Sequence, residues 1–359
     1  MGIMVGLPSP SGSEKDLQLN FGKNMTVQVE MRAPHLPAEW HMQSGIQLTW
    51  PHAGTDWAYM LAEVQECFIN IAREIAKREL LLIVTPEPEE VKKQIAATVN
   101  MDNVRFLECA TNDTWARDHG AITMIDTGTP SLLDFTFNGW GLKFASELDN
   151  QITKHAVEAG ALKGQYIDCL DFVLEGGSIE SDGMRTLLTT SECLLSPQRN
   201  GRLNQVEIEE YLKSTFHLQK VLWLDHGYLA GDDTDSHIDT LARFCSTDTI
   251  AYVKCENKED EHYEALLAME EQLKTFRTLA GEPYHLLALP MADKIEEDGE
   301  RLPATYANFL IMNDVILYPT YNQQENDKKA GEVLQQAFPN HQIIGIDCRA
   351  LIKQHGSLH

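Results

Sequence analysis

The sequence lacks the features that would suit it to nucleic acids or membranes. Its 29 Lys and Arg residues are outnumbered by 54 Asp and Glu residues, and the formal net charge is −25. Nucleic acids and anionic membranes attract basic surfaces, so neither is expected as a partner. No run of about 18 uncharged apolar residues occurs, so no membrane-spanning helix is expected. Acidic charge keeps a protein soluble and also concentrates cationic ligands near an acidic cleft.

The sequence also lacks a disulfide pattern and a secretory signal. Its seven cysteines are dispersed and include no CxxC pair. That usage is typical of a reducing compartment, so we expect a cytoplasmic protein. The N-terminus has no basic region ahead of its first apolar residues. We expect residues 1–27 to be a polar lead-in outside the fold and residues 28–359 to form a single domain.

Helical and strand-like segments alternate along the chain. An apolar rhythm near 3.6 residues predicts helices at 56–79, 88–99, 146–159, 204–216, 260–279 and 325–338. Short apolar runs predict strands at 81–84, 104–107, 167–174, 186–189, 221–224, 249–253, 285–289, 309–318 and 343–346.

Polar loops follow strands at five places in this pattern. They lie at 111–120, 175–183, 225–239, 303–308 and 354–359. Five helix–strand–loop units at roughly even spacing suggest a repeat architecture, although no residue-level repeat is visible. If the units surround an axis, the loops converge at one end, where sites tend to form.

The first loop contains Trp115, Arg117 and Asp118 within a few positions. One interpretation is a polar turn with a surface Arg–Asp pair. The other is an acidic pocket with an aromatic wall for a planar cation. A carboxylate accepts two parallel N–H bonds from a guanidinium, and an indole face attracts the same charge.

The second loop begins with Glu175, at the end of an apolar strand and before two glycines. The glycines could serve only a tight turn. A carboxylate at the mouth of a buried strand should nevertheless be paired or functional, because burying it alone is costly.

The third loop ends with the segment from Gly231 to Asp239. If His237 and Asp239 lie on a strand, the two-residue period directs both side chains to one face. A histidine beside carboxylates is the composition of a general acid/base. The alternation of Asp233, Asp235, His237 and Asp239 also permits a metal site, but the spacing fits neither an EF-hand nor a common zinc motif.

Five motifs occur in an order that resembles one known family: TWARDHG, LEGGS, GDDTDSHID, TYANF and HGSLH. With LPAEW and LTWP near the N-terminus, they cover about nine-tenths of the chain. They are similar to those of the agmatine deiminase and bacterial peptidylarginine deiminase family. The resemblance implies an α/β fold, the pseudo-fivefold α/β propeller called the pentein fold, with five repeated β-α units around a central site.

The resemblance also implies roles for particular residues. His237 and Glu175 match the catalytic acid/base pair, and Asp118 and Asp239 match the carboxylates that grip the guanidinium. Trp115 matches a wall of the pocket. Asn308 matches the asparagine of the YxNF motif and is expected to contact the substrate. No metal and no other cofactor is implied.

In the resembled family, a cysteine thiolate attacks the guanidinium carbon and directly follows the last histidine of the motif matched by HGSLH. This sequence ends at His359, and none of its cysteines occupies that position. We therefore expect the chain as given to be truncated at its nucleophile, to bind guanidinium compounds weakly and to release no ammonia.

Several functions remain open from the sequence. The leading one is hydrolysis of agmatine to N-carbamoylputrescine and ammonia. A deiminase of free or peptidyl arginine is the next; free arginine needs a basic partner for its carboxylate, and Arg117, Arg185 and Arg199 are candidates. A metal-dependent hydrolase and a non-catalytic guanidine or polyamine binder belong to other classes. The expected partner is a small cationic guanidino compound, and assembly into a homo-oligomer is left open.

Overall fold

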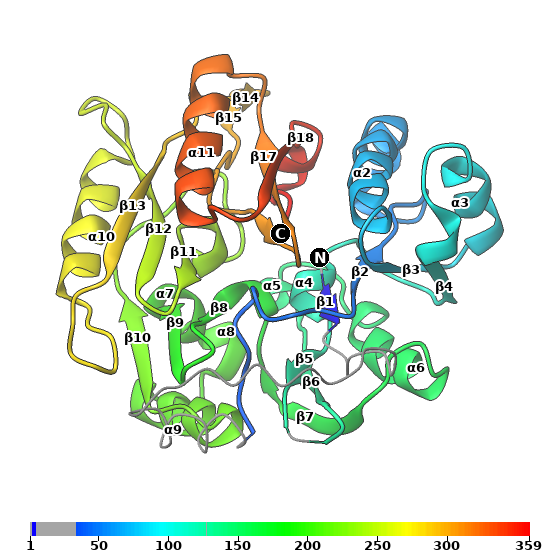
Figure 1. The fold of residues 1–359 in the computed structure, drawn as a ribbon, viewed down its shortest axis with the longest axis horizontal. Coiled ribbons are helices and arrows are strands. Elements are labelled where there is room, and N and C mark those ends of the chain that lie inside the picture. Colours follow the sequence, from blue (N-terminus) through cyan, green and yellow to red (C-terminus); the bar gives the residue numbers. More distant parts are fainter. Residues whose placement is uncertain (1, 5–33, 127) are drawn as a thin grey trace, which may run out of the picture.

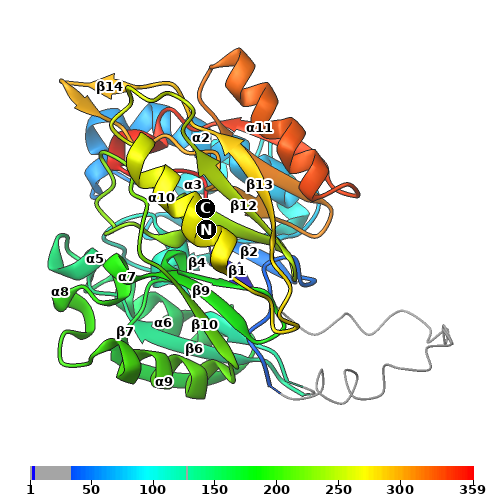
Figure 2. The same cartoon turned by 90° about the vertical axis from the view of Figure 1, so that its left-hand side faces the viewer.

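The computed structural model describes residues 2–4, 34–126 and 128–359. These residues form five sheet-containing units arranged around a central axis (Figure 1). The C-terminal residue lies near this axis in two perpendicular views (Figure 1, Figure 2).

The five main sheets contain sixteen strands among the described residues, β1 included. The first unit contains β1 Gly2–Met4, β2 Gly45–Thr49, β3 Leu80–Thr85 and β4 Val104–Glu108. The second contains β5 Ile122–Met124, β6 Ser131–Thr136 and β7 Gln165–Val173, and the third contains β8 Ile179–Ser181, β9 Thr186–Thr190 and β10 Lys220–Leu224. The fourth contains β11 Ala242–Ser246, β12 Thr249–Lys254 and β13 His285–Pro290, and the fifth contains β16 Leu310–Ile311, β17 Val315–Thr320 and β18 Gln342–Asp347. A separate hairpin is formed by β14 Glu296–Glu297 and β15 Glu300–Arg301.

Helices join the strands and pack on the sheets. The longer ones are α2 Leu61–Ala76, α3 Pro88–Ile95, α9 Gln205–Phe216, α10 Tyr263–Thr275 and α11 Gln324–Ala337. The shorter ones are α4 Ala116–His119, α5 Gly139–Leu142, α6 Ile152–Glu158, α7 Ser191–Leu194 and α8 Pro197–Asn200. Single 3-10 turns are η1 Asp56–Met60, η2 Met101–Asn103, η3 Asp149–Gln151, η4 Gly176–Ser178, η5 Ile238–Thr240 and η6 Leu351–Gln354. Within the described ranges, every helix is too short or too polar to cross a lipid bilayer.

The five units share one connection rule. The first two strands of each unit pair antiparallel, and the third pairs parallel with the second after a helical crossover. A parallel pair needs such a crossover, whereas an antiparallel pair needs only a short turn. The chain then crosses from the last strand of one unit into the first strand of the next. These crossings place one loop per unit at the axis, and the pseudo-fivefold α/β propeller is confirmed.

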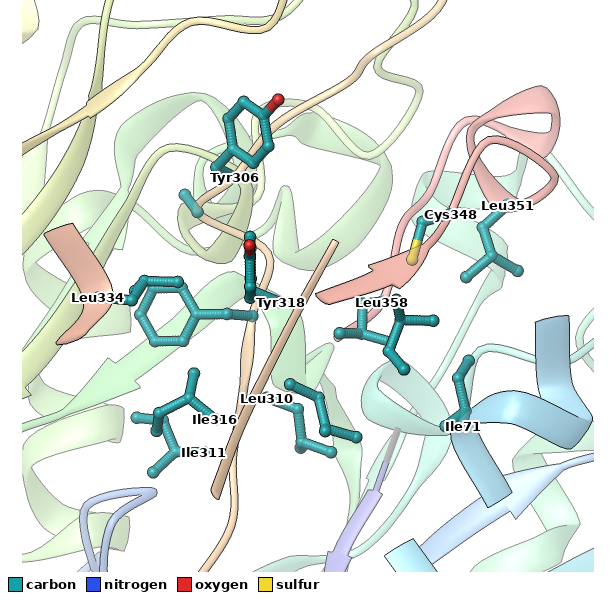
Figure 3. Close-up of a cluster of buried hydrophobic side chains, with 14 of the residues drawn as sticks. Ile71, Tyr306, Leu310, Ile311, Ile316, Tyr318, Leu334, Cys348, Leu351 and Leu358 are labelled. Atoms are coloured by element: carbon teal, nitrogen blue, oxygen red, sulfur yellow. The ribbon is translucent and has the colours of Figure 1, made fainter. Parts of the chain in front are cut away.

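The apolar core fills the space between sheets and helices. Figure 3 shows part of it, where Leu310 and Ile316 from the fifth sheet lie near Leu334 of α11 and Leu358 of the C-terminal segment. Each of these four side chains is at most 2% exposed. Full burial of such a side chain contributes roughly 1.5–3 kcal/mol, so the sheet also anchors the segment that carries the last motif.

The longer predicted helices are present, with ends that differ by a few residues. The region 56–79 begins as η1 and ends at Ala76, and 204–216 begins at Gln205 because Asn204 caps the helix. The single strand predicted at 309–318 is wrong. It is a hairpin of β16 and β17, since the backbone turns at the polar pair Asn313 and Asp314.

The N-terminal region was predicted to lie outside the fold over residues 1–27. Strand β1, from Gly2 to Met4, falls within that region and pairs antiparallel with β2. The rest of the predicted lead-in lies outside the described residues. Edge pairing needs only backbone N–H and C=O groups, so a sequence pattern gives little warning of it.

Candidate functional site

A small cavity lies where the loops converge. Its volume is about 50 Å³, and its lining comes from α4, the loop around α5, the segment before η5, the segment before β16 and the C-terminal segment. Asp118, His237 and Asp239 line it together with Trp115 and Asn308. Remote loops therefore converge as predicted, and five of the six predicted site residues line this cavity.

Asp118 is held in place by two hydrogen bonds. Trp140 Nε1 donates to its Oδ2 at 3.0 Å, and the backbone N–H of Gly177 donates to its Oδ1 at 2.9 Å. The side chain is only about a tenth exposed. These two N–H donors fix the orientation of the carboxylate.

Asp239 faces the same cavity from η5. His359 Nδ1 lies 2.9 Å from its Oδ2. Burial by itself raises the pKa of this carboxyl, but the hydrogen bond and charge of His359 outweigh it and hold the pKa at about 2. A strand here was only the condition under which both side chains would share one face, and the segment instead forms a 3-10 turn at Ile238–Thr240 that His237 precedes. Both side chains nevertheless line the cavity.

His237 is almost fully buried, at 2% exposure. Its Nδ1 lies 3.6 Å from Asp118 Oδ1, and its Nε2 lies 4.0 Å from Glu175 Oε2. Burial disfavours the imidazolium, but the negative charge of Asp118 and the groups near Nε2 outweigh it and raise the pKa of His237 to about 10. The imidazole therefore carries its proton at neutral pH.

Glu175 lies behind His237 and is not part of the cavity lining. Arg199 Nε donates to both of its oxygens, at 3.0 and 2.9 Å, and both side chains are 0% exposed. Arg199 also bonds Asp235 Oδ2 at 2.5 Å and the carbonyl of Thr234 at 2.8 Å. Glu175, a buried carboxylate expected to be paired or functional, is paired with Arg199. Arg199 is therefore not available to bind the carboxylate of a substrate.

Gly177 occupies the point at which the key groups meet. A Cβ atom at this position would lie 2.7 Å from His237 Nδ1, 2.8 Å from Asp118 Oδ1 and 3.1 Å from Asp239 Oδ2. Real Cβ contacts are not that short, so no larger residue fits without displacing them. The paired glycines of LEGGS thus serve close packing against the site as well as the turn.

Trp115 and Asn308 complete the lining. A Cβ atom on Gly356 would lie 2.2 Å from the Trp115 ring, so the indole packs directly against the C-terminal segment. Asn308 Oδ1 accepts from the backbone N–H of His359 at 2.8 Å, and its Nδ2 donates to the carbonyl of Asp239 at 3.4 Å. Asn308 therefore holds the last motif against η5.

The alternating residues proposed as a metal site do not act as one set. Asp235 is engaged by Arg199 and Lys143, whereas Asp233, His237 and Asp239 line the cavity. In the described part of the chain, the group with ligand atoms close enough for a metal is Glu175, Cys193 and His237. The Arg199 guanidinium already occupies Glu175 and opposes a second cation there.

Sequence reasoning missed four residues around the site. Trp140 and Cys193 lie outside the five motifs, and Glu39 and Arg243 form a buried ion pair beneath His359. Glu39 belongs to LPAEW, which was noted only as part of the resemblance. The one available signal was an isolated charge between apolar residues, as at Arg243 in 241–245.

The shifted pKa values of His237 and Asp239 predict how the free energy of unfolding depends on pH. The folded-state pKa of His237, about 10, exceeds its ordinary value, so its contribution is full below about pH 6.5 and is lost as pH rises through 10. The pKa of Asp239, about 2, is depressed, so its contribution is present above about pH 4 and is lost as pH falls through 2. In the alkaline window one extra bound proton corresponds to a slope of about −1.4 kcal/mol per pH unit.

Denaturant unfolding between pH 7 and 9.5 measures this slope. His237→Asn should make it less negative by about 1.4 kcal/mol per unit, and His341→Asn, which changes a histidine outside the site, should leave it unchanged. An unaltered slope in His237→Asn would show that His237 does not bind the extra proton.

Comparisons with known proteins agree with this geometry. The sequence profile of the Porphyromonas-type peptidyl-arginine deiminase family matches residues 35–359. A Marinomonas sp. (strain MWYL1) protein, provisionally named agmatine deiminase, is 32% identical over 90% of this chain and 92% of its own. A solved C. jejuni agmatine deiminase, a cysteine-to-serine variant with substrate bound, is 40% identical with a TM-score of 0.84, covering 91% of this chain and 94% of its own. For the agmatine deiminase of Enterococcus faecalis the identity is 29% and the TM-score 0.83, with the same coverage.

The matched region includes every residue that lines the cavity. The family profile and the relatives both extend over about nine-tenths of the chain. This chain is therefore a guanidine deiminase that belongs to the Porphyromonas-type peptidyl-arginine deiminase family.

Proposed function

We propose that the substrate is agmatine, hydrolysed to N-carbamoylputrescine and ammonia. The observation that carries the proposal is the convergence of Asp118, Asp239 and His237 around one small cavity. Two carboxylates that line one cavity suit the N–H groups of a planar guanidinium, and fixing that plane orients its carbon for attack. Trp115 adds an aromatic wall, which favours a flat cation.

His237 is proposed to act first as an acid and then as a base. A thiolate attacks the guanidinium carbon and forms a C–S bond; the C–N bond then breaks, and ammonia leaves with the proton from His237. Neutral His237 next takes a proton from water, whose oxygen attacks the same carbon, and the C–S bond breaks. A raised pKa gives His237 the proton needed for the first step. Glu175 is proposed to act through His237, because it lies behind the ring.

The thiolate is implied by the resemblance to the family. None of the described residues that line the cavity is a cysteine. The C. jejuni relative is a variant with one cysteine replaced by serine, and its structure has substrate bound. Binding of candidate substrates is therefore the first measurement that tests the substrate of this chain.

Charge around the cavity favours agmatine over free arginine. Asp113 and Asp233 are both in the lining and suit the distal ammonium of agmatine. Of the three arginines considered for an α-carboxylate, Arg199 is bound to Glu175, and Arg185 lines a separate hollow. Arg117 does line the cavity, so arginine is kept as the alternative substrate.

Calorimetric titration at pH 8 tests this choice. Burial raises the pKa of Asp233 to about 6, so its carboxyl is ionised at this pH. We expect agmatine to bind more tightly than L-arginine, and Asp233→Asn to weaken agmatine about tenfold, as expected for one lost ion pair in a partly buried site. Asp102→Asn removes an exposed charge in η2 and should change neither affinity. Tighter binding of arginine, unaffected by Asp233→Asn, would favour the alternative.

Turnover separates a deiminase from a non-catalytic binder. A chain with one cysteine appended after His359 is expected to release ammonia and N-carbamoylputrescine in equal amounts from agmatine. Citrulline formed from arginine instead would identify the alternative substrate. Binding without any product in the extended chain would favour a binder.

The cellular setting is inferred from thiols and charge. All seven cysteines are free, which suits a reducing compartment, and we infer the cytoplasm. The net charge of −25 makes nucleic acids and anionic membranes poor partners. Self-association remains compatible with the proposal, and sedimentation of the purified protein measures it.

A further inference from the structure

A buried cysteine lies beside His237 and outside the cavity lining. Cys193, in α7, is 0% exposed, and it is not part of the cavity lining. Its Sγ, one ring nitrogen of His237 and a carboxylate oxygen of Glu175 all lie within 4.8 Å of one another. Nε2 is the ring nitrogen nearest Glu175, so the thiol shares the niche of Nε2.

Among the described residues, His237 Nε2 is buried and has no hydrogen-bond partner within the usual geometric limits. Glu175 Oε2 is 4.0 Å away and already accepts from Arg199. A buried N–H group without an acceptor is costly, and sulfur is a weak but usable acceptor. Cys193 is the neighbouring group that can meet this need.

The backbone holds α7 and the His237 segment together. Thr190 Oγ1 accepts from the backbone N–H of Cys193 at 3.4 Å and donates to the carbonyl of Ser236 at 2.8 Å. Ser236 Oγ also donates to Glu192 Oε2 at 3.0 Å. The residues that flank the thiol are thus bonded to the residue that precedes His237, which fixes the distance between sulfur and ring.

We propose that Cys193 is a positioning residue whose sulfur accepts the Nε2–H of His237 and keeps Nδ1 directed at the substrate. The inference rests on the proposed role of His237 in proton transfer. A nucleophilic role does not fit, because Cys193 has no exposure to the cavity and burial raises the pKa of its thiol. Its effect reaches the substrate through the imidazole.

Other charged groups also face His237 and contribute to its pKa. Asp118 approaches from α4, Glu175 from the turn before η4 and Asp239 from η5, while Arg199 of α8 neutralises Glu175. A hydrogen bond from the imidazolium to sulfur favours the charged ring. Removing the acceptor should therefore lower the pKa of His237, whereas the carboxylates remain.

NMR titration of the His237 ring in the full chain tests the proposal, with the resonance assigned by its loss in His237→Asn. Cys193→Ala is expected to lower the pKa of His237 by about one unit, as loss of a hydrogen bond to a charged group implies. Cys193→Ser retains an acceptor and should stay within about half a unit of the unmodified protein. Cys169→Ala, at another buried cysteine, should cause no shift.

The result can be separated from a structural effect and from failure of the substrate assignment. If Cys193→Ala does not fold, Cys193→Val fills the volume without an acceptor and is expected to show the same lowered pKa. A change in melting temperature with the pKa of His237 unaltered would overturn the proposal, as would an amidino group mapped to Cys193 after acid quenching with agmatine. If agmatine does not bind, the pKa comparison still decides the role of Cys193.

Discussion

Gly177→Ala is expected to weaken agmatine binding at least about 100-fold while the protein remains folded. The added Cβ atom would lie under 3.0 Å from His237 Nδ1 and from Asp118 Oδ1, so one of these groups must move. It would also remove the close approach by which the Gly177 N–H holds Asp118. Misplacement of about 1 Å in a binding constellation can cost about two orders of magnitude.

Calorimetry with agmatine measures this loss, and Gly128→Ala is the matched control. A Cβ atom on Gly128 would meet nothing within 4 Å, so that variant should bind as the unmodified protein does. Circular dichroism checks that both variants are folded. Gly177→Ala with unchanged affinity would mean that the guanidinium does not occupy the space between these three groups.

Arg243→Met is expected to destabilise the fold by about 3–5 kcal/mol. The guanidinium is 0% exposed and pairs with both Glu39 and Glu180, which are also buried. Its Nη1 donates to the carbonyl of Phe309 at 2.6 Å, and its charge lies 4.7 Å from the centre of the Phe309 ring. Removing one partner of a buried ion pair leaves an uncompensated charge, which carries a penalty of this size.

Denaturant unfolding measures the change in free energy. Arg349→Met is the control, because Arg349 and Asp347 are each about half exposed and such pairs contribute at most about 1 kcal/mol. Adding Glu39→Gln and Glu180→Gln to Arg243→Met should recover part of the loss by removing the stranded charges. A destabilisation no larger than that of the control would show that the pair is dispensable for folding.

The buried charge of Arg243 also affects the site, through Glu39 and His359. Glu39 also lies 3.2 Å from His359 Nε2, and His359 Nδ1 bonds Asp239. The pKa of Glu39 is held well below its ordinary value: burial alone would raise it, but Arg243 and His359 together outweigh burial. The orientation of Asp239 therefore depends on a chain of charges that begins in the core between units.

The sequence by itself determined the repeat and much of the site. The alternation of apolar segments with polar loops predicted five units, because apolar periodicity is a local property that each element carries. The ordered motifs predicted that Asp118, His237 and Asp239 would meet, and all three line one cavity with Trp115 and Asn308. Their roles in catalysis and binding remain proposals.

Only the tertiary structure decided which buried groups are partners. Arg199 could have served a substrate, but its geometry assigns it to Glu175, and that pair lies behind His237. Arg243 and Glu39 are 204 positions apart, and nothing in either local sequence relates them. Local pattern sets which side chains are buried, whereas the pairing of buried charges depends on angstrom-scale distances that arise when the units close around the axis.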